Sequence, residues 1–230
     1  VACVWTAPWR ASIDLGPALG SVEYLAFVTG DTADAAPLPM LVVAHQGGSA
    51  PEFLRVIFRG YDTPARIVVP KAPYGLYFGN AWYHWDREWE EAELEAQHSG
   101  RLLAAFARAV AARYPTLGKP VVTGSLQGGA MVYHLAVRHP DAFAGAVPVG
   151  ANLFESLPDG AAPAIPIRAL HGEHNDWWDV EHTRETIEAM QVAGWDVDLT
   201  VVPGAGRGTR PFRQLWFETV ATVLERSPPR

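Results

Sequence analysis

The most informative part of the sequence is Val121-Val122-Thr123-Gly124-Ser125-Leu126-Gln127-Gly128-Gly129-Ala130. Its two leading β-branched residues are typical of a strand, and the pattern becomes helical after a Gly/Ser turn. A strand, a sharp turn and a helix form a nucleophile elbow, in which small residues flank a strained residue whose side chain projects above a sheet. With small residues on both sides of the apex, the apex residue is Leu126, which has no nucleophilic atom. The stretch therefore predicts an elbow and raises the question of whether it carries a nucleophile.

Apolar runs and amphipathic segments alternate through the rest of the chain. Strands are predicted at 22–28, 40–44, 66–70, 143–149, 167–170 and 197–202, besides the one before the elbow, and helices at 51–59, 90–114, 128–138, 180–192 and 211–226. Such alternation, with short connections, predicts a mostly parallel sheet with helices on both faces. Sites in these sheets lie at the carboxyl ends of the strands. With no repeat and no long linker, residues 1–230 are predicted to form a single α/β domain.

Composition excludes several classes of protein. The net charge of −7 argues against nucleic acid as a partner, because phosphate binding needs clustered Lys and Arg. No apolar run reaches the roughly 20 residues that span a bilayer. Cys3 is the only cysteine, so an intramolecular disulfide is impossible. We expect a soluble protein; the compartment stays open, with the cytoplasm slightly favoured, and so does the oligomeric state.

A set of motifs with the same order of elements carries a family resemblance. The motifs are HQGGS at 45–49, GSLQGG at 124–129, AVRHP at 136–140, AVPVGANL at 146–153, LHGEHND at 170–176, TRETIEAM at 183–190 and PGAGRG at 203–208. Over about residues 21–220 the chain resembles the bacterial phospholipase/carboxylesterase (serine esterase) branch of the α/β-hydrolase superfamily. The resemblance implies a single-domain α/β-hydrolase fold and hydrolysis of carboxylic esters by a Ser…Asp…His triad, in that chain order and without a cofactor.

The elbow of this family resembles G-x-S-x-G-G. The register that puts small residues on both sides of the apex places Leu126 at the nucleophile position. A second register makes Ser125 the nucleophile, but it places Gln127 where the tight strand-to-helix approach needs a small residue. Both registers stay open at this point.

The other two triad positions are also substituted. The family's acid corresponds to Asn175, and Asp176 could replace it if the loop bulges by one residue. Asn cannot stabilise an imidazolium by charge, a loss of about 10⁴-fold in turnover in a protease triad. The base position, in the turn after the last strand, holds Arg207, which keeps its proton in proteins and cannot act as a general base. None of the eight histidines follows the last predicted strand, since the last of them is His182.

The polar parts of an ester-hydrolysing site are still expected. By the resemblance, the oxyanion hole would use the backbone amide of Gln127 and an amide in the Gln46 region, while His45 would shape the loop. These donors stabilise a charge only after something has attacked the carbonyl.

Aromatic side chains gather in two of the loops that follow strands. The loop at 71–89 is rich in Tyr, Phe and Trp, and Trp177 and Trp178 follow the strand at 167–170. Because both loops should lie above the elbow, they predict an aromatic-walled ligand pocket with Leu126 as its floor and with walls that include Trp82, Trp85, Trp177 and Trp178. The alternative is that these rings pack beneath their own loops.

A metal site is a further alternative. His171, His174 and Asp176 are close in sequence and offer the N and O ligands that zinc prefers. Since His171 ends a strand and the following residues form a loop, these side chains need not converge, and we expect no metal and no cofactor.

The leading hypothesis is a carboxylesterase-like α/β-hydrolase-fold protein that has lost ester hydrolysis and binds a small apolar or acyl-type ligand, or a partner. The alternative is an active carboxylic-ester hydrolase that uses Ser125 with a displaced histidine, or a metal-bound water. A third class, a purely structural or interaction protein, predicts a flat site with Leu126 and Arg207 buried against their neighbours.

Overall fold

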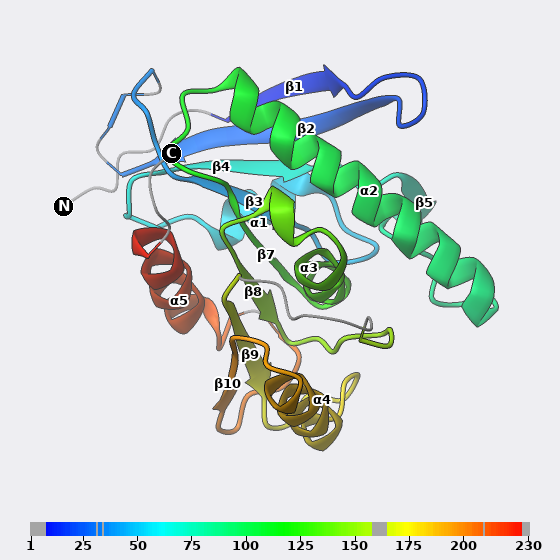
Figure 1. Ribbon diagram of the computed structural model, residues 1–230. Helices are drawn as coiled ribbons and strands as arrows, with labels where there is room; N and C mark the ends of the chain where they lie inside the picture. The colour runs from blue at the N-terminus through cyan, green and yellow to red at the C-terminus, as the bar shows by residue number, and fades with distance from the viewer. Residues whose placement is uncertain (1–7, 31, 34, 158–164, 209, 227–230) are drawn as a thin grey trace.

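The computed structural model describes residues 8–30, 32–33, 35–157, 165–208 and 210–226, so Cys3 lies outside it. Eight strands form one sheet in the order β1-β2-β4-β3-β7-β8-β9-β10 (Figure 1). Their bounds are β1 Trp9–Asp14, β2 Ser21–Thr29, β3 Met40–Ala44, β4 Ala65–Pro70, β7 Val121–Ser125, β8 Gly145–Val149, β9 Ile167–Gly172 and β10 Val197–Val202. Within this sheet, as far as the structure describes it, only the β1–β2 and β2–β4 pairs are antiparallel. The predicted mostly parallel sheet is confirmed.

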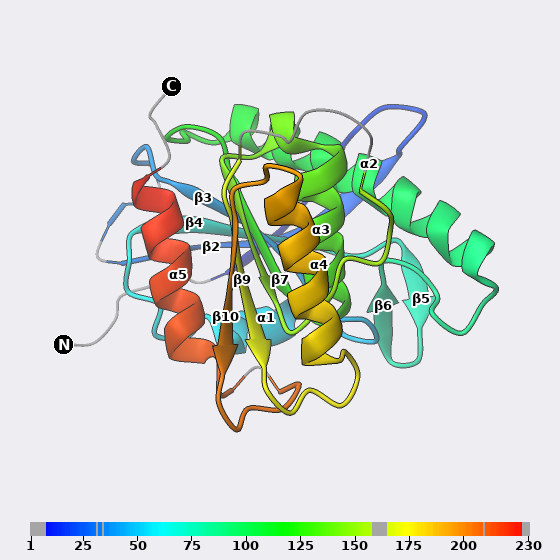
Figure 2. The same cartoon turned by 60° about the horizontal axis from the view of Figure 1, so that its bottom comes forward.

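Helices cover both faces of this sheet, also as predicted. Helices α2 (Trp89–Arg113), α3 (Gln127–Arg138) and α4 (Val180–Val192) share one core cluster with the sheet. Helices α1 (Pro51–Ile57) and α5 (Arg213–Glu225) contribute to a second cluster on the opposite face (Figure 2). The central strands β3, β4, β7 and β8 are buried at every residue because both of their faces are covered.

Local chemistry accounts for several element ends. Helix α1 begins at Pro51, whose fixed φ suits a first helical turn. Helix α4 begins after Asp179, whose carboxylate accepts a hydrogen bond from the amide of Glu181 at 3.0 Å. Helix α2 has Glu90 and Glu91 in its first turn and Arg113 in its last, which suits the helix dipole.

Strands β1, β5 and β6 and a short 3₁₀ helix, η1 (Pro140–Ala142), were not predicted from the sequence. Strand β1 pairs along β2 at the edge of the sheet, with alternate residues facing inward. The predicted loop at 71–89 contains a hairpin of β5 (Tyr74–Leu76) and β6 (Gly79–Ala81). Strands of three residues are too short to show a period of two, so the hairpin left no signal in the sequence.

Among the described residues, no helix is both long enough and apolar enough to cross a membrane.

Candidate functional site

The turn between β7 and α3 has the strained geometry of an elbow. Leu126 links the strand to the helix with φ 53° and ψ −121°, a backbone conformation that L-residues rarely adopt. Its amide donates to the carbonyl of Val149 at 3.0 Å, which ties the turn to β8. Leu126 therefore occupies the apex, and its side chain carries only carbon and hydrogen.

Glycines on either side of Leu126 make this turn possible. A Cβ on Gly124 would lie 2.6 Å from the carbonyl oxygen of Ala44, and a Cβ on Gly128 would lie 2.2 Å from the same oxygen. Both distances are shorter than real contacts, so β3, β7 and the start of α3 can approach this closely only with glycine at both positions.

Ser125 is placed differently from Leu126. It is the last residue of β7 and is buried, and its Oγ has no hydrogen-bond partner among the described residues. Its Oγ therefore forms no hydrogen bond with the imidazole of any described histidine, including His45, His171 and His174. A serine in this position is not presented to a substrate.

Asn175 uses its side-chain amide to hold the loop after β9. Its Nδ2 donates to the carbonyl of Gly150 at 3.2 Å. Its Oδ1 accepts from the amides of Trp177 at 3.0 Å and Trp178 at 3.2 Å. The side chain is buried and neutral, so it shapes the loop and contributes no charge to the site.

Arg207 and Asp176 form a pair at the surface. Asp176 Oδ1 lies 3.6 Å from Arg207 Nε, and the Arg207 guanidinium carbon lies 4.3 Å from the centroid of the Trp177 ring. The Arg207 side chain is 43% exposed. The guanidinium therefore bridges the acid and base loops and does not fill the space of an imidazole.

The three triad positions nevertheless meet at one point. A Cβ added to Gly150, just after β8, would lie 3.7 Å from Asn175 Nδ2, 3.8 Å from Leu126 Cδ2 and 4.0 Å from the carbonyl oxygen of Arg207. The three residues that the resemblance assigns to a triad thus lie around Gly150, Arg207 through its backbone, and none of the three side chains can perform the chemistry of a triad.

The loop after β3 is held by a buried histidine. The Nε2 of His45 accepts from the amide of Ala72 at 3.1 Å, so its Nδ1 carries the proton and donates to the carbonyl of Gln46 at 2.8 Å. The carbonyl of His45 accepts from Trp82 Nε1 at 2.7 Å. Burial lowers the pKa of His45 to about 4. His45 therefore has a structural role.

Gln46 and Gln127 lie on the same cavity, as oxyanion donors would. Gln127 is the first residue of α3, so its amide has no acceptor within the helix. Its side chain is used elsewhere, since Oε1 accepts from the amide of Trp82 at 3.0 Å and Nε2 donates to the carbonyl of Tyr83 at 2.7 Å. A large side chain at this position thus anchors the aromatic loop to the elbow.

A cavity of about 720 Å³ opens above the elbow. Leu126 lies in its wall beside Gln127, and aromatic rings make up much of the remainder: Tyr83, Trp85, Trp89, Phe154, Trp177 and Trp178. Among the described residues no carboxylate lines it, and Arg87 is the charged side chain that does, with His182 and Tyr83 as titratable neighbours. The prediction of Trp82 as a wall residue is wrong: Trp82 is fully buried beneath the cavity, and its indole N–H is bonded to the loop after β3.

The residues considered for a metal do not converge. His171 Nε2 lies 2.9 Å from the carbonyl of Trp178, and burial lowers the pKa of His171. His174 is exposed, 3.8 Å from Glu173. Within the described residues, no group of three or more His, Cys, Asp or Glu side chains could hold a metal ion.

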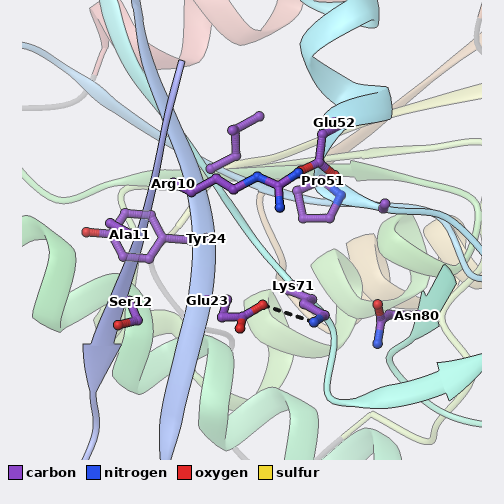
Figure 3. A pocket seen from close by; sticks show the side chains of 11 residues that line it. Arg10, Ala11, Ser12, Glu23, Tyr24, Pro51, Glu52, Lys71 and Asn80 are labelled. Atoms are coloured by element: carbon purple, nitrogen blue, oxygen red, sulfur yellow. Dashed lines mark hydrogen bonds and ion pairs between the residues drawn. The ribbon is translucent and has the colours of Figure 1, made fainter.

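A second, polar cavity of about 540 Å³ lies between β1, β2 and the start of α1 (Figure 3). Arg10 pairs there with Glu52 at 2.7 Å, and Lys71 pairs with Glu23 at 3.0 Å. Because each of these charges already has a partner of opposite sign, the cavity offers no uncompensated charge to a ligand. This cavity was not predicted from the sequence, because β1 was not predicted.

The lowered pKa of His45 predicts a dependence of stability on pH. Neutral His45 is favoured in the folded state, so the unfolded chain binds more protons between pH 6.5 and 4. The contribution of His45 to the free energy of unfolding is complete above pH 6.5. As pH falls toward 4, roughly 3 kcal/mol of it is lost. Urea unfolding measured across this range should show it as a falling free energy of unfolding.

The matched control separates His45 from other titrating groups. His45→Gln keeps an acceptor for the amide of Ala72 and should flatten the pH dependence, whereas exposed His182→Gln should leave it unchanged. Equal pH dependence in the native chain and His45→Gln would contradict the assignment.

No protein-family model and no curated protein sequence matches this chain. Solved structures do match it. A Bacillus cereus carboxylesterase superimposes with a TM-score of 0.74 at 14% identity, over 88% of this chain and 94% of that one. A Mesorhizobium loti carboxylesterase superimposes with a TM-score of 0.71 at 16% identity, over 87% of this chain and 94% of that one. The esterase PE8 superimposes with a TM-score of 0.66 at 20% identity, over 87% of this chain and 99% of that one.

These identities are low, but the superpositions span nearly the whole of each structure. Together with the mostly parallel eight-stranded sheet and the helices on both of its faces, they identify the fold. The sequence-based prediction of the fold is confirmed: the chain is a protein of the α/β-hydrolase fold.

Proposed function

We propose that this protein binds a small apolar or acyl-type ligand in the cavity above the elbow and does not hydrolyse carboxylic esters. The observation that carries the proposal is Leu126 at the strained apex. In this proposal the chain is a relative of the phospholipase/carboxylesterase enzymes that its motifs resemble. Leu126, Asn175 and Arg207 stand where those enzymes have their triad.

The chemistry of the three positions supports the loss of hydrolysis. Acyl transfer through a covalent intermediate needs a nucleophile and a base within hydrogen-bond reach of it. Leu126 cannot attack a carbonyl, and the Arg207 guanidinium is engaged with Asp176 and Trp177. Retained backbone donors near Gln127 can polarise a bound carbonyl, but without an attacking group this gives binding and no turnover.

The walls of the cavity support the ligand class. A volume of about 720 Å³ is in the range that holds a small organic molecule, and six aromatic rings provide most of the apolar contact. Leucine at the apex replaces a polar hydroxyl with a larger hydrocarbon side chain. This substitution favours an apolar chain over a polar one at the floor of the cavity.

The alternative function is an active hydrolase that uses Ser125 with a displaced histidine, or a metal-bound water. The buried, unpartnered Oγ of Ser125 and the divergence of His171 and His174 do not favour it. A purely structural protein is disfavoured as well, since it predicts a flat site with Arg207 buried. The site is instead an open cavity beside a half-exposed arginine.

Hydrolysis is tested with short- and medium-chain p-nitrophenyl esters and with a fluorophosphonate probe. We expect turnover no faster than that of the buffer and no labelled serine, with Ser125→Ala behaving as the native chain does. Rapid turnover that Ser125→Ala abolishes would instead establish the alternative, and loss of turnover with a chelator would indicate a metal-bound water.

Ligand binding is tested by titrating the tryptophan fluorescence with decanoic acid and with decanol. Because Trp178 forms part of the wall, Trp178→Ala should weaken binding about tenfold, the effect of losing about 1.4 kcal/mol of contact. Leu117→Ala, at an exposed leucine outside the cavity, is the matched control and should bind as the native chain does. If neither compound binds, or if both variants bind equally, the proposed ligand class is wrong.

A further inference from the structure

The tip of the β5–β6 hairpin exposes two aromatic side chains that neither the core nor the cavity uses. Tyr77 is 76% exposed and Phe78 is 105% exposed. Tyr77 also has a φ of 51°, where a two-residue hairpin loop favours glycine. The fold thus accepts backbone strain and holds two large apolar rings in water at one point. Such exposure marks a surface that contacts something else.

The hairpin is fixed in place by the loop after β3. The amide of Asn80 donates to the carbonyl of Ser49 at 2.8 Å, and the amide of Gly48 donates to the carbonyl of Asn80 at 3.0 Å. A Cβ on Gly79 would lie 2.3 Å from the Ser49 carbonyl oxygen, so the two segments are in close contact. The aromatic tip is therefore held in a defined position against the loop after β3.

The tip is continuous with the mouth of the ligand cavity. The Tyr77 and Trp85 ring centroids are 6.2 Å apart, and Trp85 and Trp89 are both large exposed side chains that also line the cavity. We call Tyr77, Phe78, Trp85 and Trp89 the aromatic rim. An apolar medium in contact with this rim would also meet the opening of the cavity.

The charges near the rim select between possible occupants. The segment that holds Trp85 and Trp89 also carries four exposed carboxylates, on Asp86, Glu88, Glu90 and Glu91. Its Arg87 is already paired with Glu95 at 3.0 Å. This acidic border repels an anionic surface, and a second copy of the chain would bring the same carboxylates against each other. A lipid surface with choline headgroups instead presents an outer layer of quaternary ammonium groups, which carboxylates and tryptophan faces attract.

We propose that the aromatic rim docks onto a phosphatidylcholine-type lipid surface. Phe78 and Tyr77 enter the boundary between headgroups and acyl chains, where aromatic side chains are favoured. Trp85 and Trp89 lie at headgroup depth with the acidic border facing the ammonium groups. The cavity then opens toward the layer that contains acyl chains. Docking does not depend on the chemistry at Leu126, so it stands apart from the proposed function.

The test is flotation of the full chain with phosphatidylcholine vesicles, followed by the blue shift of its tryptophan emission. We expect binding that Phe78→Ser weakens at least about tenfold, because the buried ring contributes more than the 1.4 kcal/mol that a tenfold change represents. Tyr77→Gly removes a second ring and relieves the strained φ, so it should weaken binding without lowering stability. Val192→Ser, at an exposed valine at the end of α4, is the matched control.

Vesicles that contain phosphatidylglycerol should bind less of the protein at low salt. The proposal is overturned if the native chain does not float with phosphatidylcholine, or if Phe78→Ser floats as well as Val192→Ser. It is also overturned if the chain dimerises in solution and Phe78→Ser makes it monomeric, because a second copy is then the occupant. Ester turnover and decanol binding are measured on the same samples, so failure of docking is distinguishable from failure of the proposed function.

Discussion

The constraint on which the site depends is the close approach of Gly124 and Gly128 to the carbonyl of Ala44. It draws β3, β7 and the start of α3 together until no Cβ fits between them. A chain that leaves β7 and enters α3 within this space has one residue in which to turn. That residue, Leu126, is forced to a positive φ, and its side chain projects toward the cavity. The elbow is thus a consequence of packing, and it persists whatever side chain stands at its apex.

The rest of the site is arranged around that turn. Gln127 extends from the first position of α3 to the backbone at Trp82 and Tyr83, and so holds the aromatic loop above the elbow. Asn175 fixes the loop of Trp177 and Trp178 against Gly150 by neutral hydrogen bonds. Gln127 and Asn175, at positions that resemble catalytic machinery, thus hold the aromatic walls in place, while Leu126 forms part of the wall. This is the physical basis for proposing binding in place of hydrolysis.

The sequence predicted most of the fold because its strands and helices have strong patterns. Strands at 40–44 and 197–202 and the helix at 180–192 begin and end at the predicted residues. The β5–β6 hairpin was missed because its strands are three residues long. Trp82 was misplaced because composition identifies an aromatic loop but cannot say which ring points down into the core. The pairing of Arg207 with Asp176 and its contact with the Trp177 ring depend on how two loops meet in the tertiary structure, which no local pattern reports.

The central claim is that the elbow geometry remains while its chemistry has been lost. Its most direct measurement compares p-nitrophenyl ester turnover by the native chain with turnover by a chain carrying Leu126→Ser, Asn175→Asp and Arg207→His together. Since all three positions meet around Gly150, the account predicts turnover and fluorophosphonate labelling at position 126 in the substituted chain only. Equal turnover by the two chains, or a folded substituted chain that is neither active nor labelled, would contradict it.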